Sequence, residues 1–195
     1  MVIMKLYDID IRNEVKKRLN GYKDCAILEE VKTSSGHAIA DVVAVNGHIN
    51  AYEIKSDKDS LTRLSGQVKQ YDENFERNII VVGEKYEKSI DSKVPDYWGI
   101  IVASNYNGKV RLSYKRQAKL NPNISFFAFL DHLSAKELRS VVVQNDFLFA
   151  RIELEKKDIN RLFKQDLIVK IESKISKKEK QIVKRIVRET IKGRT

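Results

Sequence analysis

The chain has 195 residues, 42% hydrophobic and 33% charged, a composition typical of a globular protein with one or two domains. Its single cysteine, Cys25, excludes an intramolecular disulfide framework, and no run approaches the about 20 apolar residues that a membrane-spanning helix needs. The chain also opens without a signal-peptide pattern, so we expect a cytoplasmic protein with no membrane partner.

The net charge of +10 is unevenly distributed along the chain. Residues 1–155 hold 23 Lys and Arg against 22 Asp and Glu, whereas residues 156–195 hold 14 against 5. Such a polarised basic segment favours a polyanionic partner, with nucleic acid first. The alternative is a solvated helical face that lysine keeps soluble.

The first half of the chain alternates helical and strand patterns. A helix is predicted over residues 9–20, because Ile11, Val15 and Leu19 have helical spacing and Gly21 follows as a stop. A short strand is expected at 25–31. Two further strands, at 37–45 and 48–55, flank Asn46-Gly47, the strongest short-range signal for an antiparallel hairpin.

A second helix is predicted over residues 60–75, where the spacing of apolar residues is again helical. The run at 78–83 is continuously apolar and rich in β-branched residues, as a strand buried on both faces should be. Another hairpin is expected from 97–104 and 109–115. Residues 1–115 therefore predict an α/β domain with a mixed central sheet.

From residue 116 onward the pattern becomes helical, which predicts a separate basic helical region over 116–195. Ser134 with Glu137, and Ser176 with Glu179, have the spacing of capping boxes at helix starts. The last helix carries an apolar stripe: Ile182, Val183, Ile186, Val187 and Ile191. A protein partner or a second copy of the chain could dock on this stripe.

Three charges in the central hairpin predict a site. Glu53 and Lys55 project from one face of their strand, and Asp41 lies on the partner strand among apolar neighbours, where an ionised side chain has no evident structural purpose. A two-residue loop would point Asp41 and Glu53 to different faces. An odd loop or a bulge would bring them to one face, either directly opposite or as diagonal neighbours.

Asp41, eleven intervening residues and then Glu53-Ile54-Lys55 on a hairpin resemble the PD-(D/E)XK nuclease superfamily, which includes restriction endonucleases, Holliday-junction resolvases and RecB-type exonucleases. Gln67 and Tyr71, four residues apart on the next helix, resemble the QxxxY motif of its RecB-like branch. Residues 8–104 look most like a bacterial and phage family assigned to this superfamily.

This resemblance implies a restriction-endonuclease-like αβββαβ core and a metal-dependent nuclease that hydrolyses DNA phosphodiester bonds. Asp41 and Glu53 would bind Mg²⁺ or Mn²⁺, with Glu14 of the first helix as a third ligand and Glu30 as its competitor. Lys55 would position or deprotonate the attacking water, and Gln67 and Tyr71 would complete the catalytic set. Endonucleolytic and exonucleolytic action both stay open.

Further basic residues are predicted to contact DNA. They lie beside the site and along the last helix: Lys58, Arg63, Lys177, Lys178, Lys184, Arg185 and Arg188. One departure from the family pattern is Ile39, where we expect an arginine two positions before the motif aspartate. This departure supports an alternative function, a non-catalytic PD-(D/E)XK module that binds DNA or acts in regulation or protein interaction.

Overall fold

The computed structural model describes residues 6–194. Two compact units divide the chain, the first ending at Ile124 and the second beginning at Ser125. The predicted boundary at 115/116 lies too early, because the segment after the last strand is tied to the first unit. Asn121 donates from its side chain to the carbonyl oxygens of Asp72 and Phe75, and its backbone N–H donates to Glu76.

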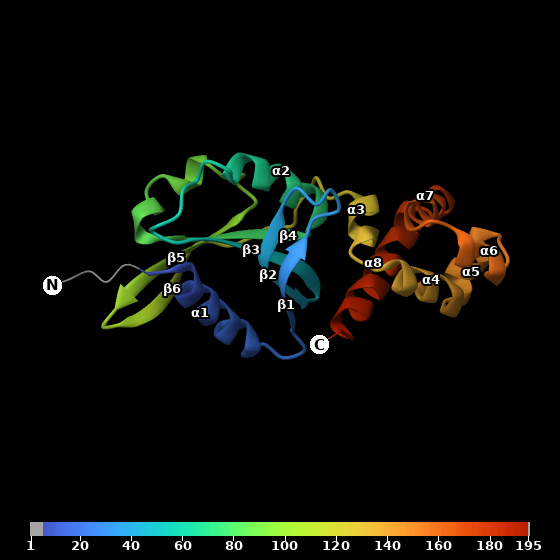
Figure 1. Cartoon of the computed structure of the whole chain (residues 1–195), viewed down its shortest axis with the longest axis horizontal. Helices are drawn as coiled ribbons and strands as arrows, with labels where there is room; N and C mark the ends of the chain where they lie inside the picture. The colour runs from blue at the N-terminus through green and yellow to red at the C-terminus, as the bar shows by residue number, and fades with distance from the viewer. Residues whose placement is uncertain (1–5, 195) are drawn as a thin grey trace. The chain divides into compact units, whose positions relative to one another are not determined.

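The first unit is built on a mixed six-stranded sheet in the order β1-β2-β3-β4-β5-β6 (Figure 1). The described strands are β1 Ala26–Lys32, β2 Ile39–Asn46, β3 His48–Lys55, β4 Arg77–Gly83, β5 Gly99–Tyr106 and β6 Lys109–Arg116. Pairing is antiparallel except for the parallel neighbours β3/β4 and β4/β5. The predicted α/β class and mixed sheet are therefore confirmed.

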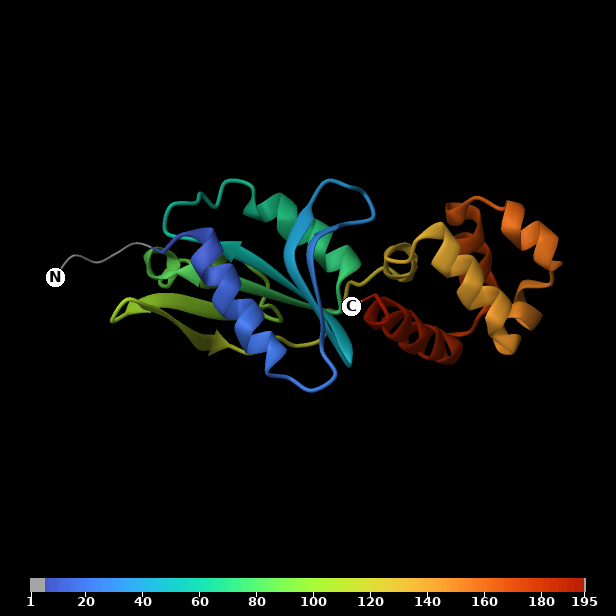
Figure 2. The same cartoon turned by 60° about the horizontal axis from the view of Figure 1, so that its bottom comes forward.

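Two helices, α1 (Asp8–Asn20) and α2 (Leu64–Asn74), cover opposite faces of this sheet (Figures 1 and 2). The predicted stripe of α1 packs in one core with alternate residues of β2, β3, β4 and β5, among them Val42 and Ile54. Since side chains alternate along a strand, Glu53 and Lys55 point to the other face, toward α2.

Helix α2 starts four residues later than predicted, because the segment after β3 forms its own turn. The backbone N–H and the hydroxyl of Ser56 both donate to Asp59 Oδ2, at 2.8 and 2.6 Å. Such local side-chain bonds compete with helix formation. Two 3₁₀ turns, η1 (Glu84–Tyr86) and η2 (Ile90–Ser92), connect β4 to β5.

The second unit is helical throughout its described part. Its helices are α3 Phe126–Asp131, α4 Ala135–Gln144, α5 Asp146–Ile152, α6 Lys156–Arg161, α7 Lys164–Lys174 and α8 Lys177–Lys192. Both predicted capping boxes are present, at the starts of α4 and α8. In α8, Val183, Val187 and Ile191 of the predicted stripe are buried, so these residues are not available to a docking partner, whereas Ile182 is 44% exposed. No helix within residues 6–194 is long and apolar enough to cross a membrane.

Candidate active site

The central hairpin has the odd register that a shared site requires. Asn46 pairs with His48 around Gly47, and the ladder continues to Val42 opposite Tyr52. Gly47 has a φ of +69°, a conformation that glycine adopts without steric cost. The next pair outward in this register is Asp41 and Glu53, so the prediction that they share a face is confirmed.

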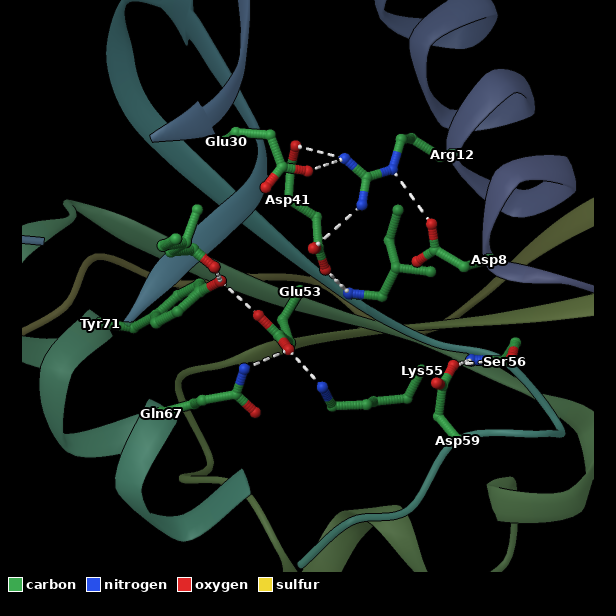
Figure 3. Close-up of polar contacts among 12 residues, drawn as sticks. Asp8, Arg12, Glu30, Asp41, Glu53, Lys55, Ser56, Asp59, Gln67 and Tyr71 are labelled. Atoms are coloured by element: carbon green, nitrogen blue, oxygen red, sulfur yellow. Dashed lines mark hydrogen bonds and ion pairs between the residues drawn. The ribbon is translucent and has the colours of Figure 1, made fainter. Parts of the chain in front are cut away.

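Glu53 is the buried centre of the site, with an exposed fraction of 1%. Its Oε1 accepts from Lys55 Nζ and from Gln67 Nε2, each at 2.6 Å. Its Oε2 accepts from the hydroxyl of Tyr71 (Figure 3). Burial, together with the neighbouring Glu53 charge, raises the pKa of Tyr71 above its usual range, so this hydroxyl remains a donor. Strand β3 and helix α2 thus hold both oxygens of one carboxylate.

Asp41 lies beside Glu53 and is held by the backbone of Ile54 and by Arg12 of α1. Arg12 Nη2 donates to Asp41 Oδ1 at 3.1 Å, and the backbone N–H of Ile54 donates to Asp41 Oδ2 at 2.7 Å. The same guanidinium contacts Asp8, four residues earlier on α1, and Glu30 of β1 (Figure 3). One half-buried cation therefore joins three carboxylates from three elements.

The backbone at Glu30 departs from strand geometry. Its φ is +54°, in the left-handed region, although the pairing of β1 with β2 keeps the same register on either side of it. For a residue other than glycine this conformation costs about 1–3 kcal/mol and is found preferentially at functional sites. At this point of the strand, the Glu30 carboxylate meets Arg12.

These side chains border a cleft of about 760 Å³ with an acidic lining. The carboxylates that line it are Asp8, Glu30, Asp41, Glu53 and Asp59, and the lysine and arginine that line it are Lys55 and Arg63. Burial, followed by the negative charge of Glu53, raises the pKa of Asp41 to about 7. Repulsion between the two facing carboxylates is therefore only partly offset by Arg12 and the Ile54 N–H.

The family of the chain follows from comparison with known proteins. The family model of bacteriophage P4 protein cII matches residues 6–195. The chain belongs to the bacteriophage P4 protein cII family. Protein cII of Enterobacteria phage P4 is 30% identical over 127 residues, an alignment that covers 65% of this chain and 48% of that protein. The chain thus spans about half the length of this curated relative.

Among solved structures, a protein of unknown function from Silicibacter pomeroyi aligns with a TM-score of 0.40 and 16% identity. The alignment covers 57% of this member of the P4 cII family and 68% of the other chain. Likeness at this level assigns neither fold nor function, so the cleft itself carries the functional argument.

The cleft of this P4 cII family member suits a divalent cation in charge and in ligand type. Carboxylate oxygens are the ligands that Mg²⁺ prefers, and a cation between Asp41 and Glu53 would relieve their repulsion. Gln67 Oε1, beside Glu53, is buried without a hydrogen-bond partner and would gain one from a hydrated ion. Within residues 6–194, however, no group of three or more His, Cys, Asp or Glu side chains is arranged to hold a metal. Both oxygens of Asp41 and of Glu53 already accept bonds, so a cation would have to displace or share these donors.

The prediction of Glu14 as a metal ligand is wrong. Glu14 Oε2 is 3.5 Å from Lys17 Nζ. Glu14 lines a different cavity, on the side of α1 that faces the β5–β6 hairpin. Asp8 and Arg12 occupy the side of α1 that faces the cleft. Glu30, the competing candidate, does line the cleft, where its carboxylate contacts Arg12.

The predicted DNA-contacting residues fall into separate places. Arg63 lines the cleft, whereas Lys58 Nζ donates to the hydroxyl of Tyr7 at 2.8 Å and lies 4.0 Å from that ring's centroid. On α8, Lys177, Lys178 and Arg185 are exposed. Lys184 and Arg188 are half-buried and make contacts, so they are less available to a partner.

Two residues of the site were missed by sequence reasoning, Asp8 and Arg12. Their four-residue spacing on the polar border of the α1 stripe was a usable signal, because it places both side chains on one helical face. The family pattern predicts an arginine two residues before Asp41, where this chain has Ile39. Arg12 of α1 instead places a guanidinium next to Asp41.

Proposed function

We propose that the chain is a metal-dependent nuclease of the PD-(D/E)XK type that hydrolyses DNA phosphodiester bonds. The observation that carries the proposal is the odd hairpin register, because it places Asp41 and Glu53 on one face with Lys55 bonded to Glu53. Gln67 and Tyr71 converge on the same carboxylate. The element order α1, β1, β2, β3, α2, β4 is consistent with a restriction-endonuclease-like core.

In this proposal Asp41 and Glu53 hold Mg²⁺ or Mn²⁺, which supplies activation of water and stabilisation of charge on the phosphate. Gln67 and Tyr71 fix the orientation of Glu53, and Arg12 with the Ile54 N–H fixes that of Asp41. Such preorganisation avoids rearrangement during the reaction.

Lys55 is the group that can leave its present partner and turn to the substrate. Its ammonium, 2.6 Å from Glu53 Oε1, can donate to a water molecule or a phosphate oxygen at the mouth of the cleft. The acidic lining explains why a cation is needed at all. Five carboxylates would otherwise repel a phosphodiester.

The test is cleavage of labelled branched, single-stranded and duplex DNA by the purified chain with Mg²⁺ or Mn²⁺. Asp41→Asn and Lys55→Ala should each abolish cleavage. Glu14→Gln is the matched control, since it removes an acidic side chain from the same unit outside the cleft, and it should cleave normally. Cleavage that survives both cleft substitutions would refute the proposed site.

A second candidate is a non-catalytic member of the superfamily that binds DNA. It is favoured by the saturation of Asp41 and Glu53 with hydrogen bonds from the chain and by the lack of a ready-made metal group among the described residues. Mn²⁺ titration followed by electron paramagnetic resonance separates the two. Binding that Asp41→Asn removes supports the nuclease, whereas no binding and no cleavage with retained DNA affinity supports the module.

A further inference from the structure

The second unit contains a groove of about 450 Å³ that is lined by side chains of α4 and α6. We refer to it as the α4–α6 groove. Because residues three and four positions apart lie on the same side of a helix, each of the two helices presents one continuous side to it. Its polar lining consists of Lys136, Arg139, Ser140 and Gln144 from α4, with Lys156 and Asn160 from α6.

The α4–α6 groove is cationic, and no carboxylate is among the described residues that line it. Lys136, Arg139 and Lys156 contribute three positive charges, and none of the three forms an ion pair within residues 6–194. By contrast, Lys157 Nζ lies 2.7 Å from Glu155 Oε2, outside the groove. The groove therefore has a local excess of positive charge that favours an anionic ligand.

Arg139 is the fixed cation of the groove. It is half-buried, and its Nη2 donates to the carbonyl oxygen of Leu162 at 2.8 Å. Its Nε is buried and has no hydrogen-bond partner in the described part of the chain. A half-buried cation without a carboxylate beside it has lost part of its hydration and gains no opposite charge in return. A bound anion would supply that charge, and a guanidinium suits the oxygens of a phosphate.

The other lining residues are mostly hydrogen-bonding groups. Ser140 offers a hydroxyl, and Gln144 and Asn160 offer side-chain amides that can donate to a phosphate oxygen. Val143 is the one apolar residue among the described residues of the lining, which include no aromatic ring. An unpaired base would find no ring to stack on, and an amphipathic peptide would find little apolar surface to anchor it. The lining therefore suits the phosphate groups of a ligand.

We propose that the α4–α6 groove binds phosphate groups of duplex DNA without reading its bases. A duplex fits better than a single strand, because its bases are stacked inside and its backbone alone reaches a groove without rings. The choice of DNA as the source of the phosphates rests on the proposed function, whereas the groove is formed by residues of the second unit alone. The second unit then supplies affinity for DNA, and the acidic cleft supplies the chemistry.

The test measures binding of the full-length chain to fluorescein-labelled duplex DNA at several salt concentrations, with chelator present so that no cleavage occurs. Lys136→Gln/Lys156→Gln removes two exposed lysines of the groove and should reduce the slope of log affinity against log salt by about 1.8. Two duplexes of unrelated sequence should show the same reduction. Lys157→Gln/Lys174→Gln is the matched control, because it removes two exposed lysines of the same unit outside the groove, and it should keep the parent slope.

A second variant places a negative charge in the groove. Ser140→Glu should weaken duplex binding by about tenfold or more, because its carboxylate repels phosphate and competes for the cations. Ser173→Glu is its control, since Ser173 is exposed on α7 and does not line the groove, and it should bind as the parent does. Circular dichroism of each variant verifies that it folds.

Three results would overturn the proposal. One is an unchanged salt slope in Lys136→Gln/Lys156→Gln. Another is an equal reduction in that variant and in its control. The third is binding of polyglutamate or pyrophosphate that is as tight as that of the duplex and is lost in Ser140→Glu, which would identify a site for acidic peptides or for a small phosphate ligand. Failure of the proposed function is read separately, because a chain that does not cleave DNA still shows the salt slopes.

Discussion

Two lysine–glutamate ion pairs, one in each unit, have the same distance between nitrogen and oxygen but differ in how far they are buried. Lys55 and Glu53 in the cleft are 2.6 Å apart with side chains 10% and 2% exposed, and Lys174 and Glu153 in the helical unit are 2.6 Å apart with side chains 36% and 66% exposed. The exposed pair keeps most of its hydration, so its contribution is small. The buried pair has lost its hydration, so each partner depends on the other. Burial, rather than distance, therefore distinguishes the ion pair in the cleft from the ion pair on the surface.

The largest expected effect comes from breaking the buried pair. Lys55→Met leaves Glu53 buried without its cation and should lower the free energy of unfolding of the first unit by about 3–5 kcal/mol. Urea denaturation followed by the fluorescence of Trp98, the single tryptophan and fully buried in this unit, measures it. Lys174→Met should change the stability of its own unit by at most about 1 kcal/mol, measured by circular dichroism. If both substitutions lowered the free energy of unfolding by the same small amount, burial would not distinguish the two ion pairs.

The pH dependence of the first unit should show the cost of the facing carboxylates. Because the pKa of Asp41 is raised from 3.8 to about 7, the folded unit holds a proton that the unfolded chain has lost between these values. With chelator present, its free energy of unfolding should therefore fall as pH rises from about 4 through 7. Asp41→Asn should flatten this part of the curve.

Asp91→Asn is the control for that measurement. The pKa of Asp91 is lowered, first by its bond with Lys115, so its charge is constant over the same interval. A slope that persists unchanged in Asp41→Asn would show that other groups cause it.

A smaller effect is expected at the capping boxes of the helical unit. The hydroxyl of Ser134 accepts from the Glu137 N–H at 3.2 Å, and Ser134→Ala should lower the stability of the second unit by about 1 kcal/mol. In the first unit, α2 has no side-chain cap, so Ser65→Ala in its first turn should change stability by less than about 0.5 kcal/mol. Circular dichroism of each variant in urea makes the comparison, and similar losses in both would contradict it.

The smallest effect concerns Glu137, whose electrostatics are the reverse of those of Asp41. Hydrogen bonds from Arg194, and then from Ser134, lower the pKa of Glu137 from 4.5 to about 2. Its contribution is present above pH 4.5 and should be lost as pH falls toward 2. Because the Glu137 side chain is partly exposed to solvent, Glu137→Gln should reduce the acid-induced loss of stability of the second unit by less than about 1 kcal/mol, as measured by urea denaturation at pH 2–5.

The centre of the candidate site could be predicted because its signals are local. Asn46-Gly47 predicted the hairpin, and the same-face requirement for Asp41 and Glu53 then predicted the odd register that is observed. The four-residue spacing of Gln67 and Tyr71 likewise predicted that they reach one spot, which is the Glu53 carboxylate. The turn residues of the hairpin and the periods of strand and helix were enough to predict which of these side chains meet.

The contribution of α1 could not be predicted in the same way. Its apolar stripe shows which face packs on the sheet, but not which flank of that stripe faces β2, since this depends on the direction in which the helix crosses the strands. Glu14 and Arg12 lie on opposite sides of the apolar stripe, and the side that carries Glu14 was wrongly expected to face the site. The unit boundary was missed for a similar reason, because Asn121 makes its contacts with Asp72 and Phe75, far away in sequence.

The left-handed backbone at Glu30 has a consequence for which sequences this position can accept. Asparagine, aspartate and glycine adopt positive φ more readily than other residues, whereas valine, isoleucine and threonine are strongly disfavoured there despite their preference for strands. Glycine or asparagine at position 30 would relieve the backbone strain, but it would remove the carboxylate that contacts Arg12. Natural variation at this position should therefore avoid the residues that strand propensity alone would select. A library that randomises residue 30 and is selected first for folding and then for function should yield two different sets of survivors.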